Sequence, residues 1–336
     1  MTMNRPHIAV IGAGLAGLSC ARQLQSAGYL VTVFDEGATP GGRMNTRRGD
    51  GWQCDHGAQY FTARDPEFIG QVAAWERAGV AMLWQPRLAV LGAGVSSLEQ
   101  RSTARFVGTP RMNAPAEWLT TGLVLKSRVT IRQIGHEDGS WRLRSDEQGL
   151  HQEHFAAVLF AVPAAQAAAL LEPLLPLTAS QAAAVVMQPC WSVMLRLSQR
   201  HDPGYDAAFI NDGPLRWIAR DGSKPGREGA EVWVAQASPE WSIAHIDMVA
   251  GDVAVLLSAA FRQLGGPAPA NVVARRWRYA KAAGQSRQRA IWLPAVRVGL
   301  CGDWLSGGRV EDAWLSGRSL AANVMASLPL RTGQTV

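Results

Sequence analysis

The chain has 336 residues, of which 47% are hydrophobic and 18% are charged, with a formal net charge of +6. This length exceeds what one compact core usually holds, so we expect two domains. Because the positive charge comes from dispersed arginines rather than from a basic run, the composition argues against a nucleic-acid partner and favours attraction of anionic small molecules.

The four cysteines lie far apart, with no Cys-x-x-Cys pair and no histidine at ligand spacing beside them. This argues against a zinc site and a disulfide framework, so we expect no metal, reduced thiols and a cytoplasmic protein. No apolar stretch is long enough to cross a bilayer, and we expect no membrane partner. The sequence is compatible with a monomer or a homodimer.

The N-terminal segment has the pattern of a strand, a helix and a second strand, at residues 7–11, 15–27 and 29–34. After the first strand stands Gly12-Ala13-Gly14-Leu15-Ala16-Gly17, and the second strand closes at Asp35. In this arrangement the first glycine makes a tight turn, the second lets the main chain approach a pyrophosphate, and the third lets the helix pack on the strand. The helix N-terminus stabilises the anion, and the acid accepts from a ribose hydroxyl. The pattern predicts a dinucleotide-binding βαβ unit.

The following elements are less regular. Residues 39–57 show no sustained period, which predicts a long ordered loop or disorder, and long loops inside a domain are usually functional. We expect helices over 65–83, 114–122, 164–186 and 251–264, and short strands and turns over 84–111. A three-stranded meander is expected over 129–135, 141–145 and 152–155, and further strands at 157–162, 191–197, 215–219 and 231–235.

The C-terminal part returns to the style of the first, with an apolar strand over 296–301 and a helix over 312–325. This order predicts an α/β fold, in which a Rossmann-type domain contains an inserted α+β substrate domain. The predicted domains are residues 1–66, 110–165 and 290–336 for the nucleotide, and residues 67–109 and 166–289 for the substrate.

Gly41-Gly42-Arg43 follows the second strand, where an enzyme that binds NAD normally continues its sheet. A glycine pair lets the main chain pass close to a cofactor, and an arginine there can neutralise phosphate. A surface turn with a solvated arginine explains this motif equally well. The stretch Leu91-Gly92-Ala93-Gly94-Val95-Ser96 lacks a third glycine and a following helix, so we expect no second dinucleotide fingerprint.

Together these motifs resemble the flavin amine oxidase superfamily. The resemblance rests on the glycine loop, Asp35, Gly41-Gly42-Arg43, Asp55 to Phe61, Gly302-Asp303 and Val310 to Gly317. Further blocks are similar to bacterial renalase-like proteins: Gln59 to Asp65, Trp217 to Arg220, Ser223-Lys224-Pro225 and Arg276 to Ala280. The likeness covers nearly the whole chain, and its first and last blocks are the most specific.

The resemblance implies a non-covalent FAD. The loop and Arg43 would take the pyrophosphate, Asp35 the adenosine ribose, the main chain at Val129 in the meander the adenine, and Asp303 ribityl or phosphate oxygens. His56 to Tyr60 would line the isoalloxazine ring, and Ala313 to Ser316 would offer N–H groups at a helix N-terminus to the reduced flavin. The implied cofactor residues are Gly12, Gly14, Leu15, Ala16, Gly17, Phe34, Asp35, Glu36, Gly42, Arg43, Met44, His56, Gly57, Ala58, Gln59, Tyr60, Val129, Gly302, Asp303, Ala313, Trp314 and Ser316.

Covalent members of the superfamily carry a cysteine in their C-terminal motif. Cys301 stands before that motif here, so we expect a small buried residue rather than a flavin link.

The resemblance also implies a reaction. Renalase-like proteins oxidise dihydronicotinamide dinucleotides reduced at the 2 or 6 position, passing a hydride to flavin N5 and the electrons to O₂, which gives NAD(P)⁺ and hydrogen peroxide. Hydride transfer needs no side-chain catalyst, so the sequence predicts none. The substrate candidates are aromatic walls and phosphate-binding arginines: Tyr60, Arg64, Trp217, Arg220, Trp233, Trp277, Arg278 and Tyr279.

Two alternatives remain open. An amine oxidase or desaturase of the same fold would use aromatic pairs to guide a neutral amine. A flavin-binding protein without turnover would show the same colour and make no peroxide.

Overall fold

The computed structural model describes residues 5–92, 94–98, 103–284 and 288–330. The chain divides into unit 1, residues 1–42, 116–186 and 282–336, and unit 2, residues 43–115 and 187–281. These boundaries differ from the predicted domains, chiefly because residues 43–66 belong to unit 2 and residues 166–186 to unit 1.

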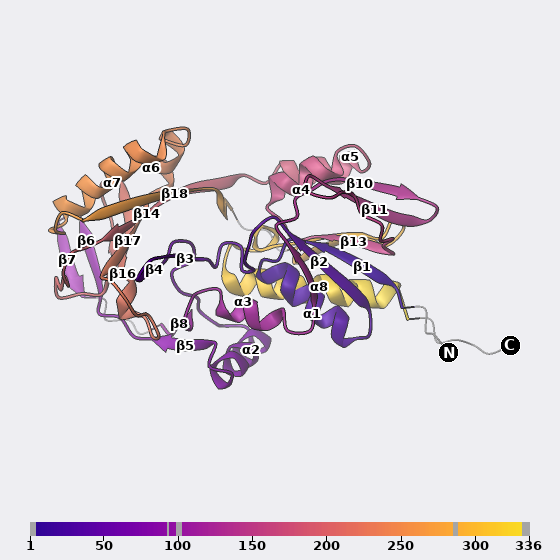
Figure 1. Cartoon of the computed structure of the whole chain (residues 1–336), viewed down its shortest axis with the longest axis horizontal. Coiled ribbons are helices and arrows are strands. Elements are labelled where there is room, and N and C mark those ends of the chain that lie inside the picture. Colours follow the sequence, from indigo (N-terminus) through magenta and orange to yellow (C-terminus); the bar gives the residue numbers. More distant parts are fainter. Residues whose placement is uncertain (1–4, 93, 99–102, 285–287, 331–336) are drawn as a thin grey trace. The chain divides into compact units, whose positions relative to one another are not determined.

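Unit 1 is built on a six-stranded sheet with the order β19-β20-β13-β1-β2-β9. Figure 1 labels its strands β13, β1 and β2. Five strands are parallel, and β19 pairs antiparallel at one edge. The strands are β1 (His7–Ile11), β2 (Leu30–Asp35), β9 (Val124–Ser127), β13 (Ala157–Phe160), β19 (Ala290–Leu293) and β20 (Val298–Cys301). The fully apolar β13 and the centre of β1 are buried, as expected for parallel strands covered on both faces.

Helices α1 (Leu15–Ser26) and α8 (Val310–Ser327) pack closely together in this unit. A methyl group on Gly317 would lie 2.1 Å from the carbonyl oxygen of Ala16, so only glycine permits this approach. The remaining elements of this part of the chain are α3 (Ala114–Leu119), β10 (Ile131–Glu137), β11 (Ser140–Ser145), β12 (Gly149–Leu150), α4 (Ala164–Leu171), α5 (Pro176–Ala183) and the 3-10 turn η2 (Asp303–Leu305).

Unit 2 contains a seven-stranded sheet with the order β18-β14-β17-β16-β15-β6-β7. Its strands are β6 (Leu88–Gly92), β7 (Val95–Leu98), β14 (Met187–Arg196), β15 (Ala207–Ile210), β16 (Leu215–Arg220), β17 (Val232–Ala237) and β18 (Asn271–Ala282). Helices α6 (Pro239–Ala244) and α7 (Ala250–Gln263) lie on one face (Figure 1), where Val253, Leu257 and Phe261 of α7 complete the core.

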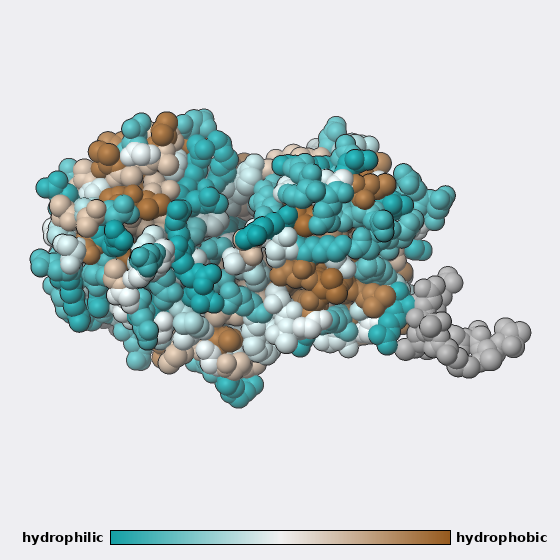
Figure 2. Space-filling view, in the orientation of Figure 1, coloured by the Kyte–Doolittle hydropathy of each residue, from teal (hydrophilic) through white to brown (hydrophobic). Residues whose placement is uncertain are grey.

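The other elements of unit 2 are β3 (Thr46–Gly49), β4 (Trp52–Asp55), α2 (Pro66–Arg77), β5 (Ala81–Trp84), β8 (Arg105–Gly108) and the 3-10 turn η1 (Asp221–Ser223). Apolar side chains also gather on the outside of α6 and α7 (Figure 2), and those most exposed there are Ile243, Val249, Val255 and Leu256. In the described part of the chain, no helix is both long enough and apolar enough to cross a membrane.

Several expectations are corrected. Residues 39–57 are not a plain loop, because β3 and β4 form an antiparallel hairpin that packs on β17 and η1. The third strand of the meander is β12, and residues 152–155 only reach an isolated bridge between Trp141 and Phe155. Strands β5, β9, β15, β18 and β19 and helix α6 were not predicted, and β5 takes up residues 81–83 of the helix expected over 65–83. In the stretch from Leu91 to Ser96, residue 93 lies outside the described residues. Strands β6 and β7, on either side of it, pair antiparallel.

Candidate functional site

The glycine loop of unit 1 forms a tight turn between β1 and α1. Gly12 adopts a φ of +108°, and its N–H donates to the Phe34 carbonyl oxygen at 2.7 Å. A methyl group on Gly17 would lie 2.0 Å from the Gly12 carbonyl oxygen, whereas one on Gly14 would meet nothing within 4 Å. The turn is therefore closed on the inside and open beside the start of α1, where a helix N-terminus favours an anion.

Asp35, at the end of β2, is held by main-chain groups. Its carboxylate accepts from the N–H of Ala13 at 2.5 Å and from the N–H of Gly37 at 2.7 Å. Burial raises its pKa, and these two hydrogen bonds oppose the rise. The Val129 N–H donates to the Asp35 carbonyl oxygen at 2.9 Å, which places Val129 beside this strand end and before β10 rather than in the meander.

The neighbours of Asp35 differ in exposure. Phe34 is fully buried, and its ring packs edge-on against His151 and Phe155, so only its main chain can meet a ligand. Glu36 is exposed.

Helix α8 begins earlier than predicted, at Val310 instead of Asp312. The Ala313 N–H donates to the Arg309 carbonyl oxygen at 3.1 Å, within the helix. The main-chain N–H groups that lack an acceptor inside a helix belong to its first turn, which starts here at Val310. This corrects the prediction that Ala313 to Ser316 form the helix N-terminus.

The C-terminal residues predicted to bind the cofactor instead form hydrogen bonds between segments of unit 1. The Ser316 hydroxyl accepts from the Gly302 N–H at 2.8 Å and donates to the Arg289 carbonyl oxygen at 2.5 Å. The Trp314 carbonyl oxygen accepts from the Ser19 hydroxyl at 2.9 Å. Asp303 is buried at the start of η2. Cys301 is buried, as expected from the sequence.

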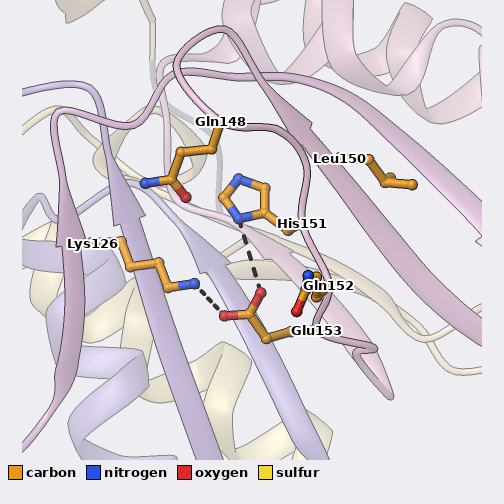
Figure 3. Close-up of a pocket in the computed structure, with 6 residues that line it drawn as sticks. All are labelled: Lys126, Gln148, Leu150, His151, Gln152 and Glu153. Carbon is orange, nitrogen blue, oxygen red and sulfur yellow. Dashed lines mark hydrogen bonds and ion pairs between the residues drawn. The ribbon is translucent and has the colours of Figure 1, made fainter.

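A surface cavity of unit 1 lies beside β9 (Figure 3) and has a volume of about 480 Å³. Glu153 stands between Lys126 and His151, and the ion pair with Lys126 holds the pKa of Glu153 below its ordinary value. Its charged groups therefore engage one another. None of its lining residues belongs to the predicted site; they are Lys126, Gln148, Leu150, His151, Gln152 and Glu153.

In unit 2, the segment after β4 is fixed through its main chain. The Ala58 N–H donates to the Arg43 carbonyl oxygen at 2.9 Å, and a methyl group on Gly57 would lie 2.0 Å from that same oxygen. The Gly57 carbonyl oxygen accepts from the side-chain amides of Gln236 at 2.7 Å and of Gln59 at 3.1 Å. These contacts fix the main chain of Gly57 and Ala58.

His56 stacks on Trp277, with ring centroids 5.1 Å apart and planes inclined by 19°. The Trp277 Nε1–H donates to the His56 carbonyl oxygen at 2.9 Å, and the Arg275 guanidinium lies 5.5 Å from the Trp277 ring centroid. Burial, assisted by the charges of Arg275 and Arg47, lowers the pKa of His56 to about 4, so its ring is neutral at pH 7. Arg43 donates to the Ala280 carbonyl oxygen at 3.0 Å.

A buried cluster of four charges lies beneath this segment. Lys224 Nζ donates to Asp55 Oδ2 and Asp221 Oδ1, each at 3.0 Å, and to Gln59 Oε1 at 3.2 Å. Arg227 donates to Asp55 Oδ2 at 2.7 Å. The four side chains are at most 2% exposed. Lys224 and Arg227 hold the pKa of Asp55 down at about 2 against its burial.

Three aromatic rings meet on the sheet face opposite α7. Tyr60 lies 5.7 Å from Trp217 and 6.2 Å from Trp84, and the two tryptophans are 6.5 Å apart, between centroids. The Arg105 guanidinium lies 5.4 Å from the Tyr60 ring centroid, and Lys224 Nζ lies 5.8 Å from that of Trp84. A cation thus lies near two members of this aromatic trio (Tyr60, Trp84 and Trp217).

Most of the chain matches a known protein family. Residues 88–325 match the family described as flavin containing amine oxidoreductase, and residues 10–73 match the NAD(P)-binding Rossmann-like domain. The chain belongs to the flavin containing amine oxidoreductase family.

Curated relatives of this flavoprotein family match shorter segments. An L-amino-acid oxidase of Daboia russelii is 45% identical over 58 residues, which cover 17% of this chain and 12% of the relative. A lysine-specific histone demethylase 1 homolog of Arabidopsis thaliana is 42% identical over 73 residues, covering 20% of this chain and 9% of the relative. The chain thus spans about a tenth of the length of these relatives.

Solved structures share the fold over nearly the whole length. Cyclohexylamine oxidase of Brevibacterium oxydans superposes with a TM-score of 0.75 at 13% identity, over 96% of this chain and 99% of the other. A putrescine oxidase bound to putrescine gives 0.75 at 14% identity, with the same coverage. The predicted α/β fold is confirmed, and so are FAD and oxidoreductase chemistry as properties of the family.

Each unit, taken by itself, has a feature that fits part of a flavin dinucleotide. The open space beside Gly14 leaves room for a phosphate at the start of α1. In unit 2, His56 is 7% exposed, and its Nδ1 atom has no hydrogen-bond partner among the described residues. Such a buried polar atom is costly unless a ligand or water completes it.

The structure separates the predicted substrate residues into those that meet and those that do not. Tyr60 lies beside Trp217, and Trp277 beside His56. Trp233 is fully buried in the core against α7, so it cannot be a substrate wall. Arg220 is paired with Glu231 at 3.1 Å and with Asp206 at 3.5 Å.

The remaining candidates lie on β18 and after residue 60. Arg278 pairs with Asp247 and, by the alternation of a strand, points away from the face that carries Trp277 and Tyr279. Tyr279 is half-buried, and Arg64 is exposed.

Sequence reasoning missed Trp84, Arg105, Arg47, Arg275 and the charged cluster. The signal for Arg275 was present, because it stands two residues before Trp277 in β18 and therefore lies on the same face of the strand. Trp84 carried no local signal.

Proposed function

We propose that the chain is an FAD-dependent oxidase of 2- or 6-dihydro-NAD(P), with O₂ as acceptor and NAD(P)⁺ and hydrogen peroxide as products. The observation that carries the proposal is the positive, aromatic character of unit 2 around residues 56–60. The aromatic rings can stack on a flat ring, and the positive charges suit phosphates better than they suit an ammonium ion.

The charges support this proposal. Within the described part of the chain, Arg47 and Arg275 have no carboxylate partner, and both act electrostatically on His56. The nearby carboxylates of Asp55 and Asp221 are already engaged by Lys224. A cationic amine would therefore meet uncompensated positive charge, whereas a phosphate would meet partners.

The reaction asks little of the side chains. FAD, when bound, supplies the hydride acceptor and returns the electron pair to O₂, which takes up the hydride hydrogen and one proton. His56 stays neutral at pH 7, so it offers a hydrogen bond rather than a charge. Tyr60 and Trp277 would orient the dihydropyridine ring, and Arg275 would bind a phosphate of the substrate.

For the cofactor, we propose the glycine loop and the first turn of α8 from Val310, together with Asp35, Asp303 and residues 56–60. Arg43 and the main chain at Val129 remain candidates for the pyrophosphate and the adenine. The Ser316 hydroxyl is assigned a structural role, because it already joins Gly302 to Arg289.

The deciding experiment is anaerobic reduction of the purified holoprotein. Its flavin should bleach with the isomers formed by borohydride reduction of NAD⁺ and not with amines or L-amino acids, and air should then yield peroxide. Bleaching by amines alone would overturn the proposal, and colour without bleaching by any compound would favour a flavin-binding protein without turnover.

Two variants sharpen this test. Arg275→Gln should raise KM for the dinucleotide about tenfold, since it removes a charge-assisted hydrogen bond, and should leave an isomer of reduced nicotinamide riboside unaffected. Arg278→Gln is the matched control, because this arginine on the same strand pairs with Asp247, and it should change neither KM.

The second candidate is a flavin amine oxidase. The family match supports it, as do the structural neighbours named for cyclohexylamine and putrescine oxidation. It predicts bleaching by amines in the same panel.

A further inference from the structure

Trp217 is enclosed by other aromatic rings. Its ring centroid lies 4.8 Å from that of Phe209 and 5.7 Å from that of Tyr60, with Trp84 on a further side, and the residue is only 5% exposed. Its neighbour Ile218 belongs to the core beneath α7, so Trp217 projects from the opposite face of the sheet. Little of the ring is left for stacking on a substrate, and its remaining function is the indole N–H.

That N–H is unpaired. Trp217 Nε1 is buried and has no hydrogen-bond partner among the described residues. The adjacent Trp84 shows the usual arrangement, because its Nε1 donates to the Ser223 hydroxyl at 3.2 Å. Buried tryptophan N–H groups normally find an acceptor, so a ligand atom or a water molecule is expected to complete Trp217.

The chemistry of the surrounding groups narrows the choice. An indole N–H only donates, and the guanidinium of Arg105, which lies over Tyr60, also only donates. A protonated amine has no lone pair and cannot accept from these donors, and a neutral amine nitrogen has only one lone pair, whereas a carbonyl oxygen has two.

We propose that Trp217 Nε1 donates a hydrogen bond to the carboxamide oxygen of the dihydronicotinamide ring and thereby selects substrates that carry this group. The inference rests on the proposed function and names the specificity-determining residue of the same site.

The test compares two substrates across three variants. The substrates are the borohydride-generated isomers of NADH and those of its thionicotinamide analogue, in which sulfur, a weaker acceptor, replaces the carboxamide oxygen. Trp217→Phe keeps a ring and removes the N–H, and should lower kcat/KM about 3- to 10-fold for the carboxamide substrate only. The wild-type preference for oxygen over sulfur should disappear.

Two controls separate this role from packing. Trp84→Phe removes an indole N–H of the same aromatic trio, but this N–H already has an acceptor, the Ser223 hydroxyl. Trp75→Phe removes a buried N–H that is likewise unpaired among the described residues, but beside Phe61 and Phe68 of another cluster. Both should keep the preference for oxygen, and melting temperatures would verify that all three variants fold.

An equal loss for both substrates, or none, in Trp217→Phe would overturn the inference and leave the N–H to water or to packing. A wild-type flavin that no isomer bleaches would overturn the proposed function first, and the inference with it.

Discussion

Lys224→Met tests the buried charges of unit 2. Lys224 is fully buried and donates to Asp55, Asp221 and Gln59 at 3.0 to 3.2 Å. The wild-type cluster balances two carboxylates with two cations, and methionine would leave one carboxylate uncompensated. Breaking a buried pair in this way costs about 3–5 kcal/mol of unfolding free energy. The loss should also loosen residues 56–60, because Gln59 holds the carbonyl oxygens of Asp55 and Gly57.

Urea unfolding followed by tryptophan fluorescence and circular dichroism would measure this cost, with equal slopes required for comparison. The matched control is Arg87→Met, which breaks ion pairs with Asp202 and Asp206 at an arginine side chain that is itself 44% exposed, and it should cost far less. The double variant Lys224→Met/Asp221→Asn restores charge balance and should regain part of the stability. If Lys224→Met unfolds like wild type, the cluster does not hold this unit together and the reasoning fails.

Three further predictions concern the cofactor, pH and the substrate. Gly14→Ala should leave the apoprotein as stable as wild type, because a methyl group there meets nothing within 4 Å. The same methyl group should weaken FAD binding at least tenfold, because it occupies the space expected for a phosphate. Equilibrium dialysis that finds unchanged FAD affinity would contradict a phosphate at this point. The pKa of His56 is lowered to about 4 in the folded protein, below the ordinary 6.5 of the unfolded chain. Between pH 4 and 6.5 the unfolded chain therefore binds a proton at His56 that the folded protein does not bind. The free energy of unfolding should fall by roughly 2–3 kcal/mol as the pH decreases through this window. His56→Gln should flatten that dependence, and an unchanged slope would exclude His56 as its source. Arg220→Gln should lower stability without raising KM for the dinucleotide, since Glu231 and Asp206 already occupy its guanidinium; steady-state kinetics that show a raised KM would refute this.

The sequence by itself determined the nucleotide-binding end of the fold. The turn from β1 into α1 and the acid that closes β2 lie within 29 residues, from His7 to Asp35. Their geometry depends on local rules: glycine conformations, helix starts and the apolar run of a buried parallel strand. These rules operate between chain neighbours, so residue order alone reveals them.

Only the tertiary structure decided which residues meet around residues 56–60. Trp84 reaches Trp217, and Lys224 reaches Asp55, across more than 100 residues of chain, and no local pattern encodes such contacts. Strand alternation then decided which arginines remain available, because Arg278 and Arg275 of one strand point to opposite faces. Trp233 is excluded as a substrate residue by its burial, and Arg220 by its ion pair with Glu231. Both properties depend on packing partners that are distant in the linear sequence or not recognisable from it.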